Sequence, residues 1–77
     1  MKNKVQIYRL KIPSVTDNLH IIREFVIKIA AKAGFNEENQ QQIALAVDEA
    51  CTNVIKHAHQ YSSRKPIEIG LYIDTKK

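Results

Sequence analysis

Apolar and polar residues alternate near both ends of the chain, which is the pattern of β-strands. The first alternating stretch spans residues 4–12, and the second spans residues 67–74. The apolar positions of the first stretch are Val5, Ile7, Leu10 and Ile12. Because the pattern slips by one position between Ile7 and Leu10, it predicts an edge-type strand with a bulge. The second stretch alternates without a break and predicts a regular strand.

Between these strands, apolar residues recur at three- and four-residue steps, as in an amphipathic helix. The first such stripe consists of Leu19, Ile22, Val26, Ile29, Ala30 and Ala33, widened by Phe25. Ser14 and Asp17 stand three residues apart, which resembles a capping box, with Thr16 as the competing N-cap. We therefore expect the helix to begin there. Gly34 suits the position that follows the last helical residue.

A second helix is predicted from Asn36, a favourable N-cap, to about His59. Glu37 and Glu38 stand in its first turn, where the helix dipole favours acidic side chains. The apolar arc of this helix consists of Ile43, Val47, Ala50, Cys51, Val54 and Ala58. Residues 60–66 are polar and without a pattern, so we expect a loop.

The order strand, helix, helix, strand predicts an α+β fold in a single domain over residues 1–77. Two strands alone leave exposed edges. Either the strands pair in a small sheet beneath two helices, or further strands come from a partner chain or from a segment after Lys77.

Composition narrows the function classes. Hydrophobic residues make up 44% and charged residues 26%, as in ordinary soluble domains. Cys51 stands alone and no Cys/His pairs have metal-ligand spacing, so we expect a cytoplasmic protein. Charges interrupt every apolar run of residues 1–10, and the chain has no 18-residue apolar span, so neither a signal peptide nor a membrane association is expected. The net charge of +4 is unevenly spread and accompanies no nucleic-acid-binding motif, so we expect no direct nucleic-acid partner.

Three polar residues follow one another along the second predicted helix. Glu49, Asn53 and His57 stand at i, i+4 and i+8, so a carboxylate, an amide and an imidazole line one side. An ordinary amphipathic helix explains this spacing by itself. Asn is a poor helix former, however, so its place in mid-helix suggests a role for its amide.

Residues 44–59, ALAVDEACTNVIKHAH, resemble the N-box of the GHKL, or histidine-kinase-like, ATPases. The pattern of that box is Glu, three residues, Asn and often a His four residues later. The surrounding elements resemble the anti-sigma factor serine kinases of this superfamily: a strand ending at Ile12-Pro13, a helix with Arg23, and a Gly34-Phe35 turn. The resemblance covers nearly the whole chain and implies a two-layer α/β sandwich of the GHKL type, here in partial form.

The resemblance implies a protein kinase that uses ATP and Mg²⁺. Asn53 would supply an oxygen ligand to Mg²⁺, and Glu49 would orient or deprotonate a serine hydroxyl of the protein substrate. His57 would contact phosphate, or would pack and orient the motif. Arg23 would face a partner, either a sigma factor or an anti-anti-sigma (STAS-type) protein, unless it is an ordinary solvated arginine. Members of this branch commonly form homodimers, so a homodimer is expected.

The sequence departs from the family pattern after the second strand. The family presents an Asp-x-Gly-x-Gly box that binds adenine, and then a Gly-rich lid, whereas the glycines of this chain are Gly34 and Gly70. We therefore expect a truncated domain with weak nucleotide affinity. The alternative is a non-catalytic module that keeps the fold and docks a signalling partner through its basic first helix.

Overall fold

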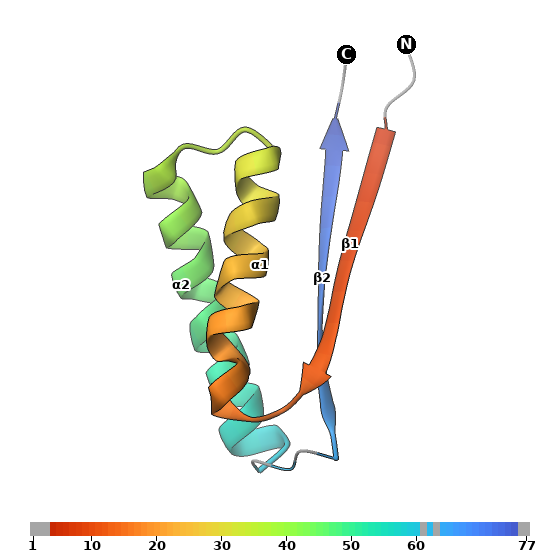
Figure 1. Ribbon diagram of the computed structural model, residues 1–77, viewed down its shortest axis with the longest axis vertical. Coiled ribbons are helices and arrows are strands. Elements are labelled where there is room, and N and C mark those ends of the chain that lie inside the picture. The colour runs from red at the N-terminus through yellow and green to blue at the C-terminus, as the bar shows by residue number, and fades with distance from the viewer. Residues whose placement is uncertain (1–3, 61, 63, 76–77) are drawn as a thin grey trace.

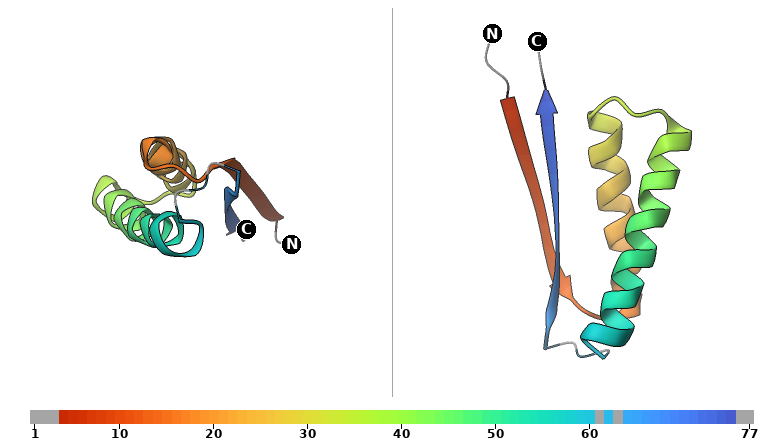
Figure 2. Two further views of the ribbon diagram at one scale, coloured as in Figure 1. Left: turned by 90° about the horizontal axis from the view of Figure 1, so that it is seen from below. Right: turned by 180° about the vertical axis from the view of Figure 1, so that it is seen from behind.

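The computed structural model describes residues 4–60, 62 and 64–75, so Tyr61 and Ser63 of the predicted loop lie outside the described residues. The elements in chain order are β1 (Lys4–Pro13), η1 (Thr16–Asn18), α1 (Leu19–Lys32), α2 (Glu37–Asn53), η2 (Val54–Ala58) and β2 (Pro66–Thr75). The helices form one layer and the two strands form the other (Figures 1 and 2). The predicted α+β class and partial two-layer fold are therefore confirmed. No helix in the described part of the chain has the length and apolarity to cross a membrane.

β1 and β2 pair antiparallel in one continuous register, with the proline that ends β1 opposite the proline that begins β2. No residue is left over on either strand, so the predicted bulge is wrong. The slip in the apolar pattern arises because the apolar residues of the first half of β1 and those of its second half lie on opposite faces of the sheet. Leu10 and Ile12 pack beneath the helices, whereas Val5 and Ile7 are exposed. Odd and even positions of a strand point to opposite faces, which accounts for both pairs.

The hydrophobic core lies between α1, η2 and the first half of β2. Ile22 and Val26 of α1 and Ile55 of η2 are fully buried, and Ile67 and Ile69 of β2 lie in the same cluster. This contiguous cluster is the main source of stability in so small a domain.

The apolar arc of α2 is narrower than predicted. Ala44 and Cys51 are buried, but Ala50 and Ala58 are exposed. α2 packs mainly against α1 rather than on the sheet, so a narrower side of it is covered. Ala58 lies in the wider turn of η2, which carries it off the predicted arc.

Two of the predicted helix-boundary signals are confirmed. The Asn36 side chain accepts a hydrogen bond of 2.8 Å from the Asn39 N–H, as an N-cap does. Gly34 has a φ of +100° directly after α1, a conformation that glycine adopts without steric cost. These residues therefore fix the turn between the two helices.

The predicted capping box at Ser14 and the competing N-cap at Thr16 are wrong. Thr16 is the first residue of η1, and neither η1 nor α1 has a side-chain cap. Ser14 is completely buried, and its Oγ lies 2.7 Å from His59 Nδ1. The Ser14 N–H also donates to the Lys65 carbonyl at 3.2 Å. Ser14 thus joins the end of β1 to the segment that leads from η2 into β2.

Shortening a core side chain tests this packing. Ile55→Ala removes a fully buried side chain and should lower the free energy of unfolding by about 2–5 kcal/mol. Leu45 lies on the same continuous helix but is 65% exposed, so Leu45→Ala should change stability by less than about 0.5 kcal/mol. Urea unfolding followed by circular dichroism gives both values. Equal losses in the two variants would contradict the described core.

Candidate functional site

Glu49 and Asn53 lie one helical turn apart at the end of α2, and both side chains are exposed. The α-helical period therefore places the carboxylate and the amide on the same side of the helix. The side-chain hydrogen bonds and the ion pair of the described residues all involve other side chains. The oxygen atoms of both residues are therefore open to a ligand.

His57 lies in η2, where the helix changes from α to π geometry. The His59 N–H donates to the Val54 carbonyl at 2.8 Å, a hydrogen bond that spans five residues. A π turn is wider than an α turn, so the α-helical spacing that relates Glu49 to Asn53 does not continue unchanged to His57. Glu49 and Asn53 thus lie one turn apart in α2, and His57 is exposed in the π turn that follows.

The contact between His59 and Ser14 holds the π turn in place. It joins the continuation of α2 to the end of β1 across 45 residues of sequence. After it, Gln60 takes a left-handed φ of 50°, which ends the helical segment. Sequence reasoning missed this contact, and the second histidine of the HAHQ stretch is the one local signal that could have indicated it.

Arg23 pairs with an acidic residue of the neighbouring helix. Its Nη1 donates to Asp48 Oδ1 at 2.8 Å, with the side chains 44% and 26% exposed. The pair joins α1 to α2 beside Glu49 and offsets the negative charge of Asp48. Nearly half of the arginine side chain remains accessible. Arg23 therefore pairs with Asp48 and still exposes part of its side chain to solvent.

Cys51 lies between Glu49 and Asn53 in sequence but faces the core. Burial, and in smaller part the nearby charge of Asp48, raises the pKa of its thiol above the ordinary value of 9.0. The neutral thiol packs in the hydrophobic cluster, so Cys51 is a core residue of α2 rather than a nucleophile.

This arrangement can be compared with known proteins. The family model of the Histidine kinase-like ATPase domain matches residues 12–77. The chain belongs to this family. Its relatives include the Serine-protein kinase RsbW of Bacillus mycoides (strain KBAB4), 32% identical over 75 residues, and that of Bacillus subtilis (strain 168), 29% identical over 76 residues. The predicted family is therefore confirmed.

These matches cover nearly all of this chain but only part of each relative. They include 96% of this chain in both cases, against 47% of the Bacillus mycoides protein and 48% of the Bacillus subtilis protein. A third relative, the Serine-protein kinase RsbW of Bacillus cereus (strain AH187), is 31% identical with the same coverage, 96% and 47%. This histidine kinase-like ATPase chain thus spans about half the length of its relatives.

The exposed side-chain oxygen atoms of α2 are chemically suited to bind the Mg²⁺ that the family implies. Mg²⁺ prefers hard oxygen ligands, takes few of them from the protein and keeps several waters. The amide oxygen of Asn53 and the carboxylate of Glu49 are such ligands, and their exposure leaves room for water and phosphate oxygens. The imidazole nitrogen of His57 is a ligand for softer metals. Asn53 is therefore the residue that would hold the ion, and Glu49 would remain available to the serine hydroxyl of a substrate.

The Arg23 and Asp48 pair should contribute little to stability, because both side chains are partly exposed and water screens their attraction. In a double-mutant cycle with Arg23→Ala and Asp48→Asn, we expect a coupling energy below about 1 kcal/mol. Urea unfolding of the four proteins measures it. A coupling above about 2 kcal/mol would show that the pair is a structural link that solvent does not screen.

The burial of Cys51 predicts slow alkylation. Iodoacetamide at pH 8 should modify the folded chain at least about tenfold more slowly than the urea-unfolded chain, as followed by mass spectrometry, since the thiolate is the reactive form. Equal rates would contradict the burial of this thiol.

The same shift in the pKa of Cys51 has a consequence for stability at high pH. Because the folded-state pKa is raised, Cys51 contributes stability that is present below pH 9.0 and lost as pH rises through the folded-state pKa. We expect the stability of Cys51→Ala to fall less steeply above pH 9.0 than that of the unchanged chain, measured by urea unfolding at several pH values. Parallel curves for the two proteins would contradict the raised pKa.

Proposed function

We propose that the chain carries the N-box half of an ATP-dependent serine protein kinase that regulates a sigma factor and phosphorylates an anti-anti-sigma partner. The observation that carries the proposal is the pair Glu49 and Asn53, exposed and one turn apart on a helix of a histidine kinase-like ATPase domain. The names of the relatives, each called a serine-protein kinase, support the choice of substrate.

Each residue of the pair has a separate part in the proposed reaction. Bound ATP with Mg²⁺ supplies the phosphoryl group and neutralises its charge. Asn53 would hold the Mg²⁺ through its amide oxygen. Glu49 would accept a hydrogen bond from the serine hydroxyl of the partner protein, orient its oxygen and take its proton, while the phosphoryl group passes from ATP to that oxygen and ADP leaves. His57, beside the pair, contacts phosphate, and Arg23 contributes its exposed part to the partner surface.

In this proposal the 77 residues hold only part of the nucleotide site. They contain no Asp-x-Gly-x-Gly sequence and no Gly-rich segment that could cover the phosphates. Adenine recognition and phosphate cover are therefore not supplied by these residues. We expect the chain by itself to bind nucleotide weakly.

A non-catalytic protein-interaction module is the second candidate. The basic residues of α1 favour it, because Arg23 is partly accessible and Lys28 is exposed. An acidic surface of a sigma factor or of a signalling partner would attract these residues. The outer edges of the two strands, which have no strand partner among the described residues, would suit a homodimer. In this case residues 44–59 would keep the N-box sequence but would neither bind nor hydrolyse a nucleotide.

Calorimetric titration with Mg-ATP tests the kinase proposal on this chain and on any longer product of its gene. The longer product should bind, and Asn53→Ala should weaken binding at least about tenfold through loss of the metal ligand. Asn39→Ala is the matched control, because Asn39 is exposed at the other end of the same helix. Micromolar binding by the 77 residues would contradict an incomplete site. No binding by the longer product would favour the interaction module.

A further inference from the structure

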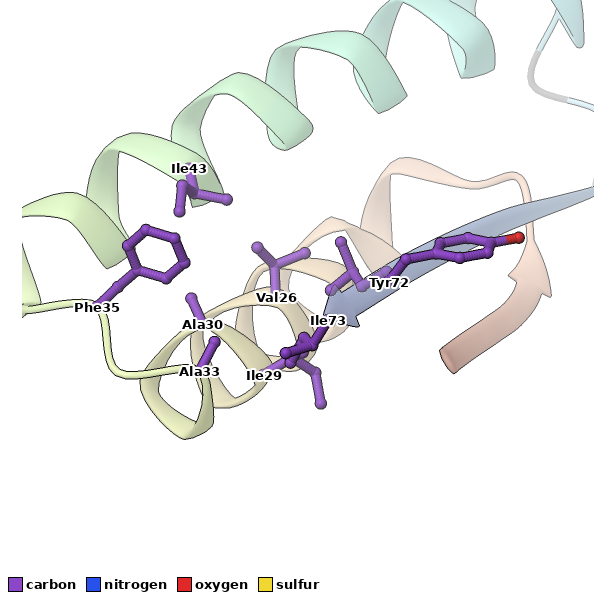
Figure 3. Close-up of a pocket in the computed structure, with 9 residues that line it drawn as sticks. Val26, Ile29, Ala30, Ala33, Phe35, Ile43, Tyr72 and Ile73 are labelled. Atoms are coloured by element: carbon purple, nitrogen blue, oxygen red, sulfur yellow. The ribbon is translucent and has the colours of Figure 1, made fainter. Parts of the chain in front are cut away.

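Leu45 is an exposed apolar residue in the same helix as Glu49 and Asn53. Its side chain is 65% exposed. In Figure 3, Ile43 of this helix lies across from the side chains of α1, and together with Phe35 it lines an apolar hollow. Two residues along an α-helix correspond to a rotation of about 200°. Leu45 therefore lies on the side of α2 opposite to Ile43.

Leu45, Glu49 and Asn53 stand at i, i+4 and i+8 of α2. Residues four apart in an α-helix lie on the same side, about 6 Å from each other along the axis. This side of α2 thus presents an apolar side chain, a carboxylate and an amide, in that order. Ala46 and Ala50 beside the row are also exposed, and their methyl groups are too short to cover Leu45.

The proposed reaction assigns the two ends of this row to different reactants. Asn53 would hold the Mg²⁺ of the nucleotide, and His57 follows it in η2, so the phosphates would occupy the Asn53 end. Glu49, in the middle, would take the proton of the serine hydroxyl. Phosphoryl transfer requires the attacking oxygen and the leaving group to lie roughly in line, on opposite sides of the transferred group. The polypeptide that carries the serine would therefore lie at the Leu45 end.

Spacing within the substrate indicates which of its residues would meet Leu45. In an extended segment, side chains two residues apart point to the same side and lie about 6.6 Å from each other. This distance matches the rise of about 6 Å between Leu45 and Glu49. A serine at Glu49 therefore places the side chain two positions along the substrate next to Leu45.

We propose that Leu45 is a specificity-determining residue, which selects substrates with an apolar side chain two positions from the phosphorylated serine. The inference rests on the proposed kinase function and names the substrate sequence that this site prefers. An apolar side chain would be buried against Leu45, which favours binding. A polar side chain would lose water there without gaining a hydrogen bond, because the leucine side chain has no polar atom.

Two peptides test this preference on the 77-residue chain without nucleotide. Both contain one serine among glycines, and they differ two positions before and two positions after that serine. These positions are leucine in one peptide and asparagine in the other. Leucine and asparagine have the same branched arrangement of side-chain heavy atoms and no charge, so the comparison isolates polarity. In a titration followed by NMR, the leucine peptide should bind at least about fivefold more tightly than the asparagine peptide.

Leu45→Ala should reduce this preference to less than about twofold, because alanine is too short to contact the leucine of the peptide. Val5→Ala is the matched control and should leave the preference unchanged. Val5 is 58% exposed, and it lies on the face of the sheet that turns away from the helices. Neither substitution removes a buried side chain, and circular dichroism checks that both variants fold.

NMR also locates the bound peptide. The backbone amide signals of residues 45–49 should shift during titration with the leucine peptide, and those of residues 5–9 should not. Equal affinity for the two peptides, no binding of either, an unchanged preference in Leu45→Ala, or shifts confined to β1 would each overturn the proposal. Because the titration contains no ATP, its failure is distinct from a failure of the kinase function, which Mg-ATP binding by the longer product tests.

Discussion

The packing of α1 against both the sheet and α2 is the constraint on which the rest of the structure depends. Ile22 and Val26 are fully buried because α1 contacts both strands and the neighbouring helix. A two-stranded sheet supports one helix, so α2 is held through α1 and through the end of η2. The exposed Glu49 and Asn53 are therefore placed by contacts that α2 makes on its other side.

Local signals made much of this fold predictable from sequence. Apolar and polar residues alternate from Ile67 to Ile73, and this pattern predicted β2 because one face of the strand is covered by the core and the other is exposed. Asn36 and Gly34 act within a few residues of themselves, so their roles can be read from neighbouring positions. Ser14 could not be interpreted this way. Its position three residues before an acidic residue is typical of a helix cap. The Ser14 side chain is instead buried and contacts a residue 45 positions away, and the local sequence does not contain this information.

The candidate site was predictable to the point at which the helix period changes. Glu49 and Asn53 both lie in α2, where spacing alone places them on one side. His57 lies in the π turn of η2 together with the buried Ile55, and no periodic pattern indicates where the helix changes from α to π geometry. Asp48 was missed for a similar reason, because its partner Arg23 is on another helix.

The charges beside the N-box bear on the order of events at the proposed site. Asp48 and Glu49 are adjacent acids, and among the described residues Arg23 forms an ion pair with Asp48 and not with Glu49. The carboxylate of Glu49 would therefore repel the phosphates of a nucleotide that approached without a cation. Asn53 adds a neutral oxygen donor and no positive charge. The proposed site is thus suited to a nucleotide that arrives with its Mg²⁺, and free ATP should bind more weakly than Mg-ATP.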